Sequence, residues 1–307
     1  MTRYADLPLV EGTGERHCWS EFGAEDELGS LNRLTPEIAI AASRLVRSGK
    51  TFSLDLPLNE PGIFGDMRPV YTHNVSVAGY GRDDSLDGFF MSASSQWDGL
   101  RHVRYREHGY YGGRQENDLD GSRAIGIDRV AEKGLVTRAV LLDIPNFMRQ
   151  TGREWNADTK FRVATETLEE ILDYEGVQTK VGDVLLVRTG WLESWLARPR
   201  GQRPNGIGQT PGLDPGRQTA EWLWDRGIVG VAADNLAVEP VPYTDRGDGH
   251  LHFRLIPLLG IYMGELFDLR ALSQDCIEDG IFEGMFVSSP LKVPSGVCSP
   301  PNAYFIK

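Results

Sequence analysis

The chain has 307 residues, 40% hydrophobic and 25% charged, a composition typical of a globular protein with one large domain or two small ones. Its net charge of −12 disfavours binding to nucleic acid or to an anionic membrane surface, and no run reaches the ~18 apolar residues of a membrane span. The three cysteines form no CxxC pair and the N-terminus has no apolar signal region. We therefore expect a cytoplasmic protein without a thiolate zinc site or a disulfide framework.

Residues 1–34 are polar and rich in glycine, and they predict an irregular N-terminal arm. A helix follows, because Thr35 can cap its start, Pro36 suits its first turn and Gly49 suits the position after its end. Beyond it, alternating or continuous apolar runs typical of strands are separated by amphipathic stretches typical of helices. Strands are predicted at 51–56, 70–78, 88–92, 136–144, 184–189, 228–233 and 285–290, with a further apolar run at 256–263. Helices are predicted at 165–176, 191–196, 219–226 and 271–280.

The interleaving of strands and helices predicts an α/β fold with a mixed sheet. Residues 103–125 are rich in Tyr, Gly, Arg and Asn and predict a loop over a site. No shift in composition, repeat or low-complexity tract marks a boundary. Residues 1–307 are therefore predicted to form a single domain, with 1–34 as its N-terminal arm.

A carboxylate, an imidazole, a guanidinium, an amide and an indole lie within residues 94–102 (SSQWDGLRH). Asp98 and His102 are four positions apart, so they would share one face of a helix and could still converge in a turn. Such a pair is common at divalent metal sites and in acid–base catalysis; the alternative is a hydrogen-bonded pair that shapes a loop. Both residues are catalytic candidates.

Neighbouring side chains are candidates for contact with a substrate. Trp97 and Tyr105 could wall an aromatic pocket, although a tryptophan is more often part of the core. Arg101 could hold a substrate carboxylate with two hydrogen bonds, and the alternative is a surface salt bridge.

A second cluster lies far downstream. If residues 250–252 form a strand, His250 and His252 project from the same side of it, which suits metal binding. Glu265 follows an apolar run and is either the solvated end of a strand or an inward ligand. The acidic residues near these histidines either raise their basicity or form a solvated loop; they are Glu239, Asp245 and Asp248.

Several enzyme classes lack their sequence motifs here. There is no GxxxxGK[ST] loop for phosphate, no GxGxxG fingerprint for a dinucleotide and no GxSxG elbow for a nucleophilic serine. Hydrolysis through a serine nucleophile therefore has no local support.

Residues 92–102 (SASSQWDGLRH) resemble the central motif H-x-G-T-H-x-D-A-P-x-H of the cyclase-like metal-dependent hydrolases, which include bacterial kynurenine formamidase, isatin hydrolase and trans-dienelactone hydrolase. Asp98 matches the motif's aspartate, a metal ligand in the family, and His102 matches its last histidine, the proton-transfer residue. Other segments are similar to family segments as well: 26–32 (DELGSLN), 182–191 (GDVLLVRTGW), 252–266 and 289–302.

The sequence departs from the family motif at two metal-ligand positions. Ser92 and Gln96 stand where the family has histidines, as in a branch with Gln-Trp-Asp-Gly in place of His-x-Asp-Ala. Gln96 is therefore expected to be a weak oxygen ligand or a substrate contact. The spacing between histidine and glutamate in the downstream segment also leaves His250 as a rival to His252.

The resemblance implies a swivelling β/β/α domain, with a mixed barrel-like sheet flanked by helices, assembled as a homodimer or homotetramer. It implies one divalent metal ion, zinc in preference to manganese, held by Asp98, His252 and Glu265. The expected reaction is hydrolysis of a cyclic amide, a lactone or a related carbonyl compound, with His102 moving the proton. The alternatives are a metal-free lyase, dehydratase or cyclase using His102 and Asp98 as acid and base, or a non-catalytic binder of small molecules.

Overall fold

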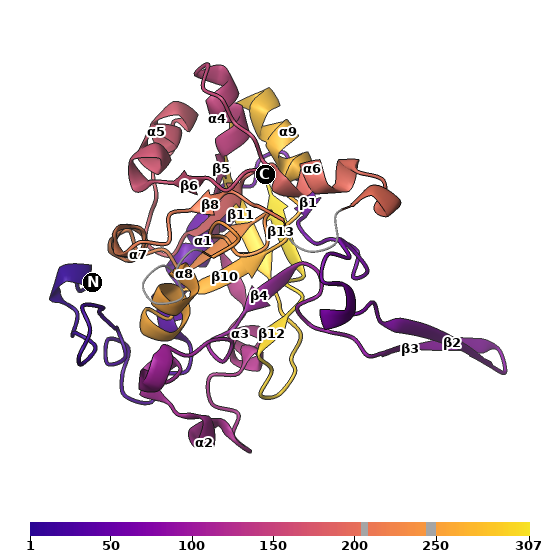
Figure 1. The fold of residues 1–307 in the computed structure, drawn as a ribbon, viewed down its shortest axis with the longest axis horizontal. Coiled ribbons are helices and arrows are strands. Elements are labelled where there is room, and N and C mark those ends of the chain that lie inside the picture. Colours follow the sequence, from indigo (N-terminus) through magenta and orange to yellow (C-terminus); the bar gives the residue numbers. More distant parts are fainter. Residues whose placement is uncertain (204–207, 244–249) are drawn as a thin grey trace.

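The computed structural model describes residues 1–203, 208–243 and 250–307. Within them, nine strands form one mixed sheet at the centre of the molecule (Figure 1). In sheet order the strands are β1 (Thr51–Ser53), β13 (Ala303–Ile306), β11 (Glu283–Ser288), β5 (Leu135–Asp143), β7 (Val184–Arg188), β9 (Gly230–Ala233), β10 (Tyr262–Glu265), β4 (Gln96–Asp98) and β12 (Cys298–Ser299).

The middle of the sheet is parallel and its two sides are antiparallel. Strands β5, β7, β9 and β10 run parallel to one another, and they are largely apolar because helices and loops cover both of their faces. On one side β11, β13 and β1 continue the sheet in antiparallel pairs. On the other side β4 pairs antiparallel with β10, and β12 pairs with β4.

Helices surround this sheet (Figure 1). The α-helices are α1 (Pro36–Ser43), α2 (Glu116–Leu119), α3 (Ile127–Lys133), α4 (Ile144–Gln150), α5 (Thr165–Glu175), α6 (Trp191–Ala197), α7 (Arg217–Asp225), α8 (Leu251–Phe253) and α9 (Arg270–Asp279). A π-helical segment, Arg254–Leu258, continues from α8. Short 3₁₀ turns lie at Tyr4–Asp6, Gly29–Arg33, Gly65–Met67, Arg106–His108, Tyr111–Gly113 and Arg200–Gln202.

The α/β class and most of the predicted elements are confirmed. The strands predicted around β5, β7, β9 and β11 are present, and so are the helices predicted around α5, α6, α7 and α9. The N-terminal helix is shorter than predicted, because α1 already ends at Ser43.

Two strand predictions are wrong. The strand predicted at 88–92 is a turn: a hairpin closes at Gly79, so the partner of β2 (Thr72–Ala78) is β3 (Gly81–Asp87), and Gly88, with φ of +72°, ends it. The strand predicted at 250–252 is instead the start of helix α8. These residues are helical because the Glu239 carboxylate accepts hydrogen bonds from the backbone of Leu251 and His252.

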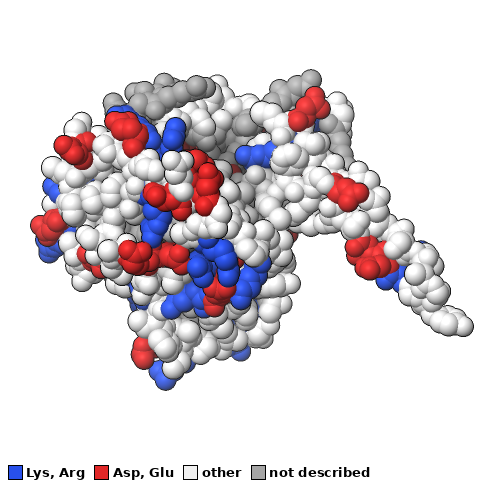
Figure 2. All heavy atoms as spheres, turned by 90° about the horizontal axis from the view of Figure 1, so that it is seen from below, with Lys and Arg blue, Asp and Glu red and all other residues white. Residues whose placement is uncertain are grey.

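The hairpin of β2 and β3 projects from the body as a free ribbon (Figures 1 and 2). All residues of both strands are exposed. Strands β6 (Arg162–Val163) and β8 (Gly212–Leu213) form another two-stranded sheet, which is parallel. None of the helices in the described ranges is long and apolar enough to cross a membrane.

Residues 1–34 pack against the segment that carries α8. The indole Nε1 of Trp19 donates a hydrogen bond to the carbonyl of Pro257 at 2.7 Å. The carboxylate of Glu15 accepts from Arg254 at 2.9 and 3.1 Å, and both side chains are buried. The N-terminal residues thereby hold the π-helical segment in place.

A buried carboxyl group at the end of α5 makes stability depend on pH. Burial raises the pKa of Glu175 to about 9 from 4.5, even though its Oε1 accepts a hydrogen bond from the backbone of Asp143 at 2.9 Å. The folded state therefore keeps a proton that the unfolded chain releases above pH 4.5, so this group's contribution to stability is lost as the pH rises from about 4.5 to about 9.

We expect Glu175→Gln to keep the Oε1 acceptor and to remove this dependence. Relative to the unchanged protein, its free energy of unfolding should gain up to about 1.4 kcal/mol per pH unit between pH 5 and 8. Denaturant titrations at pH 5, 6.5 and 8 measure the difference, with the exposed Glu170→Gln of the same helix as control. Parallel pH profiles for the two proteins would contradict the prediction.

Candidate active site

The short strand β4 brings two polar side chains into the interior. Its three residues are all buried and alternate in direction, so Gln96 and Asp98 lie on one face and Trp97 on the other. On β10, Glu265 is paired with Gln96, and paired residues of antiparallel strands share a face. The sheet register thus brings Gln96, Asp98 and Glu265 together, with Gln96 and Glu265 169 positions apart in the sequence.

Gln96 links the two carboxylates. Its Nε2 donates to Glu265 Oε2 at 2.7 Å and to Asp98 Oδ1 at 3.3 Å. Two oxygens of this group, Gln96 Oε1 and Asp98 Oδ2, are buried and accept no hydrogen bond within the described part of the chain. Since buried polar atoms are nearly always paired, these two oxygens are suited to a bound group.

His252 reaches the cluster because Glu239 organises the start of α8. The Glu239 carboxylate accepts from the backbone N–H of Leu251 at 2.7 Å and of His252 at 3.2 Å, which satisfies donors that a helix start leaves free. This cap explains why 250–252 is helical and not extended. Glu239 Oε1 also lies 2.6 Å from His252 Nδ1, which orients the ring and leaves Nε2 directed at the other carboxylates.

The Nε2 atom of His252 lies 3.2 Å from Glu265 Oε1 and 3.8 Å from Asp98 Oδ2. His102 approaches from the turn after β4, with its Nδ1 3.8 Å from Asp98 Oδ1. The two imidazole rings are 6.2 Å apart, centre to centre. Two segments of the chain therefore place their imidazoles around one buried carboxylate.

The groups of the cluster have different pKa shifts. Burial raises the pKa of Glu265 to about 7, and the charge of Asp98 adds to the rise. Burial also opposes ionisation of Asp98, but the imidazoles of His102 and His252 outweigh it and lower the pKa of Asp98. The charge of Asp98 raises the pKa of His102, but burial together with the charges of His252 and Arg68 outweighs it, so that pKa is lowered. The site thus pairs an ionised Asp98 with a neutral His102 at pH 7.

Burial opposes the protonation of His252 as well. The carboxylates around it, Asp98, Glu239 and Glu265, outweigh burial and raise the pKa of His252 well above its ordinary value. A positive charge at this position is therefore favoured. Either a proton on His252 or a cation beside its Nε2 supplies one.

The donor atoms fit a divalent metal ion. One ligand atom each from Asp98, His102 and His252 lie within 4.8 Å of one another. Ligands bound at about 2.1 Å around a tetrahedral ion lie roughly 3.4 Å apart, close to the separations of 3.2 and 3.8 Å measured from His252 Nε2. Imidazole and carboxylate donors suit zinc or manganese. The expected ligand Glu265 is next to His252 but outside this group of three, in which His102 stands instead.

These residues open into a pocket of about 310 Å³. Both polar and apolar side chains line it, and it lies between the root of the hairpin, the turn after β4 and helix α8. The lining residues are Phe64, Arg68, His102, Val103, Leu236, Val241, Tyr243, His250, His252, Phe253 and Glu265. Asp98 and Gln96 lie buried beneath this surface.

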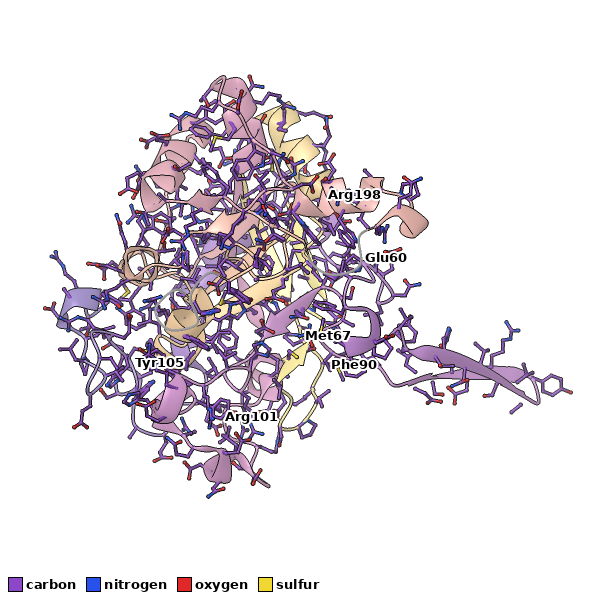
Figure 3. All side chains as sticks on the ribbon, viewed as in Figure 1. Glu60, Met67, Phe90, Arg101, Tyr105 and Arg198 are labelled. Carbon is purple, nitrogen blue, oxygen red and sulfur yellow. The ribbon has the colours of Figure 1, made fainter. Side chains whose placement is uncertain are left out.

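Three predicted substrate contacts lie outside the pocket lining. Trp97 is on the opposite face of the sheet, where it packs edge-on against Phe267 and donates from Nε1 to Ser288 Oγ at 3.0 Å. Arg101 donates to four backbone carbonyls, which occupies most of its hydrogen-bonding capacity; they belong to Leu119, Ser122, Ala124 and Ser295. Tyr105, labelled in Figure 3, is buried and packs edge-on against Phe253.

Both downstream histidines reach the pocket, but in different surroundings. His252 lies beside Asp98 and Glu265, whereas the His250 ring packs against Tyr243 at 4.4 Å and Phe253 at 5.0 Å. The geometry therefore favours His252 as the ligand. Asp245 and Asp248, expected near these histidines, lie outside the described residues.

Sequence reasoning missed the pocket residues contributed by the root of the hairpin. Arg68 stacks over the ring of Phe64 at 4.2 Å, and its guanidinium donates to the carbonyl of Ser92. No motif marks these residues. Glu239, in contrast, was expected to raise the basicity of the downstream histidines or to lie in a solvated loop, and its contact with His252 Nδ1 favours the first alternative.

Comparison with known proteins places this geometry in a family. A family model described as "Putative cyclase" matches residues 61–240. A crystal structure of a novel cyclase is 30% identical, with a TM-score of 0.83 over 95% of this chain and 99% of its own. The curled nine-stranded sheet resembles half of a barrel and matches that structure, which confirms the predicted barrel-like α/β fold.

More distant structures share the fold. Isatin hydrolase A from Labrenzia aggregata, bound to benzyl benzoate, is 17% identical, with a TM-score of 0.55 over 90% of this chain and 98% of its own. The enzyme of that name from Ralstonia solanacearum is 18% identical, with a TM-score of 0.55 over 89% and 98%. No curated protein matched the sequence. Since the family model spans more than half of the chain and the 30% relative nearly all of it, this chain belongs to the Cyclase family.

Proposed function

We propose that this protein is a metal-dependent hydrolase that opens a cyclic amide, a lactone or a related carbonyl compound with water. One observation carries the proposal: donor atoms of Asp98, His102 and His252 converge within 4.8 Å of one another beside a pocket of about 310 Å³. Membership of the Cyclase family and the fold shared with isatin hydrolases support it.

We assign one divalent ion to Asp98, His252 and Glu265, with zinc preferred to manganese. When bound, the ion supplies the Lewis acidity that polarises a carbonyl oxygen and makes water a stronger acid. Glu239 holds the proton of His252 Nδ1 and so keeps Nε2 turned to the ion. Gln96 fixes the orientation of both carboxylates through its Nε2, and its free Oε1 is the oxygen that stands in for the family's histidine.

His102 moves the proton. It is neutral at pH 7, lines the pocket and has its Nδ1 turned to Asp98 at 3.8 Å. Its Nε2 is then the atom that accepts a proton from the attacking water and delivers it to the leaving group. A positioned imidazole of this kind accelerates a reaction by about 10²- to 10⁴-fold.

The pocket walls favour a flat, largely apolar substrate with one polar end. Phe64, Tyr243 and Phe253 contribute aromatic surface, and Arg68 is the cation among the described lining residues. Ring opening of a cyclic amide or lactone creates a carboxylate, which a guanidinium binds well. We therefore propose that Arg68, in place of Arg101, binds this carboxylate.

Metal removal tests the function. Purified protein should contain close to one equivalent of zinc or manganese, and it should hydrolyse a member of a panel of isatin, dihydrocoumarin and N-formylkynurenine. Chelation should lower the rate about 10³-fold, as expected from the loss of several kcal/mol of transition-state stabilisation, and the preferred ion should restore it. Absorbance assays follow each substrate.

Other outcomes would replace the proposal. Turnover that survives complete removal of metal would favour the metal-free lyase, dehydratase or cyclase, with His102 and Asp98 as acid and base. Tight binding of panel compounds without turnover in metal-replete protein would favour a non-catalytic binder.

A further inference from the structure

Two residues next to carboxylates of the site have a backbone conformation that their own side chains disfavour. Val238, just before Glu239, has a φ of +60°, and Leu266, just after Glu265, has a φ of +57°. For residues other than glycine this left-handed region is about 5- to 30-fold less populated than the right-handed region, and for a β-branched residue it is a genuine outlier. Such conformations persist only where the surrounding structure holds them, and they gather at functional sites.

Val238 is the central residue of a tight turn between β9 and Glu239. The N–H of Glu239 donates to the carbonyl of Ala237, which makes these three residues a γ-turn. With a positive φ at its centre, a γ-turn is of the rare and strained kind. The carboxylate that follows the turn caps the start of α8 and lies 2.6 Å from His252 Nδ1. The direction of this carboxylate therefore depends on Val238 staying in the left-handed region.

The side chain of Asn235 holds this turn, and it is completely buried. Its Oδ1 accepts hydrogen bonds from the backbone N–H groups of Val238 at 2.8 Å and of Ala237 at 3.4 Å, as in an Asx-turn. Its Nδ2 donates to the carbonyl of Pro211 at 2.6 Å. Three of the four hydrogen-bonding positions of the amide are thus occupied, so neither alanine nor aspartate can reproduce its contacts.

The backbone of strand β8 packs against the same turn. The N–H of Leu213 donates to the carbonyl of Val238 at 2.9 Å. A Cβ atom at Gly212 would lie 2.3 Å from the Val238 carbonyl oxygen and 2.5 Å from the carbonyl carbon of Glu239, so only glycine allows this approach of the two backbones. Because Asn235 also binds the carbonyl of Pro211, its amide joins the turn to the segment that packs against it.

The backbone of Asn235 contacts the second left-handed residue. Its carbonyl accepts a hydrogen bond from the N–H of Leu266 at 2.9 Å, directly after Glu265. The carbonyl of Leu266 accepts in turn from Ser95 Oγ at 2.6 Å, and Ser95 precedes Gln96 in the chain. Asn235 therefore links the turn that carries Glu239 to the end of β10 that carries Glu265.

We propose that Asn235 is a positioning residue of the metal site, an inference that rests on the function proposed above. Its amide keeps Val238 in the left-handed conformation, which directs the Glu239 carboxylate at His252 Nδ1. His252 Nε2 is thereby turned toward the two remaining carboxylates of the site. Buried hydrogen bonds are stronger than exposed ones because the interior has a low dielectric constant, and here they offset the strain of the turn. Asn235 does not line the pocket, so it acts through Glu239 and His252.

Removal of the amide, with and without relief of the strain, tests this role. In Asn235→Ala we expect Val238 to relax to a negative φ and Glu239 to move away from His252, so zinc affinity should fall about 10- to 100-fold. The double variant Asn235→Ala/Val238→Gly should recover most of that affinity, because glycine adopts a positive φ without strain. Val238→Gly alone should bind zinc as the unchanged protein does, since Asn235 still holds the turn. Isothermal titration of zinc into metal-free protein measures all four affinities.

A second double variant separates positioning from a general loss of packing. Ile125 is also a buried β-branched residue with a positive φ, of +50°, but it lies outside the pocket lining. Asn235→Ala/Ile125→Gly should therefore bind zinc no better than Asn235→Ala. Equal zinc affinity of the two double variants, or unchanged affinity in a folded Asn235→Ala protein, would overturn the proposal.

A measurement on metal-free protein distinguishes this inference from the function on which it rests. In NMR spectra of protein with labelled histidine, the Nδ1–H proton of His252, assigned with His252→Gln, should exchange slowly because it is bound to Glu239. The signal should be lost in Asn235→Ala and regained in Asn235→Ala/Val238→Gly. This pattern in a protein that binds no zinc would refute the proposed function and support the positioning of His252. Zinc binding together with an Nδ1–H signal that survives Asn235→Ala would support the function and refute the positioning role.

Discussion

Replacing Asp98 by asparagine should abolish metal binding and reduce hydrolysis about 10³-fold, the loss of several kcal/mol of transition-state stabilisation. Asp98 is fully buried, its pKa is lowered, and its Oδ2 has no hydrogen-bond partner in the described ranges. An amide of the same shape keeps the packing but removes the negative charge that a cation requires. Isothermal titration with zinc into metal-free protein measures the first effect, and the isatin assay measures the second.

Two comparison variants separate ligand loss from damage to the fold. Asp128 is equally buried and pairs with Arg123 outside the pocket lining, so Asp128→Asn should bind zinc as the unchanged protein does. Glu239 would act on a bound ion only by orienting His252, so Glu239→Gln should weaken zinc binding by about 10- to 100-fold without abolishing it. Full zinc affinity in a folded Asp98→Asn protein would remove Asp98 from the ligand set.

The central architecture could be predicted because its signals are local. Strands β5, β7 and β9 are apolar runs bounded by turn residues, and α5 has a helical period with Gly176 in the left-handed conformation at its end. The hairpin strand β3 (GRDDSLD) was missed because its residues have low strand propensity and face solvent on both sides. Its pairing comes from the turn at Gly79 and not from a hydrophobic pattern.

The candidate site was predictable in composition but not in arrangement. The residue types made Asp98, His252 and Glu265 candidates and the family resemblance selected them, and the register of β4 with β10 brings Asp98 and Glu265 together over a long sequence distance. The helical start at Leu251 depends on the Glu239 carboxylate, a tertiary contact that no local pattern contains. Arg68 lines the pocket because the chain passes beside it before the hairpin begins, and no local sequence pattern predicts that position.

Replacing His102 by glutamine should retain the metal while turnover falls about 10²- to 10⁴-fold. The reason is that the proposed ligands Asp98, His252 and Glu265 would remain, whereas an amide side chain cannot carry a proton at neutral pH. Zinc titration and the isatin assay on the same protein preparation give both values. His108→Gln is the matched control, because His108 stacks on Tyr105 outside the pocket lining.

The alternative role for His102 predicts a different pair of results. Its Nδ1 belongs to the group of three donor atoms within 4.8 Å, so it could itself hold the ion in place of Glu265. In that case His102→Gln would lose zinc as Asp98→Asn does, and Glu265→Gln would keep it. Because His102 retains 24% exposure of its side chain while Asp98 has none, the imidazole can reach a substrate in the pocket, which favours proton transfer over ligation. Zinc binding by the two variants together therefore identifies which side chain holds the ion and which moves the proton.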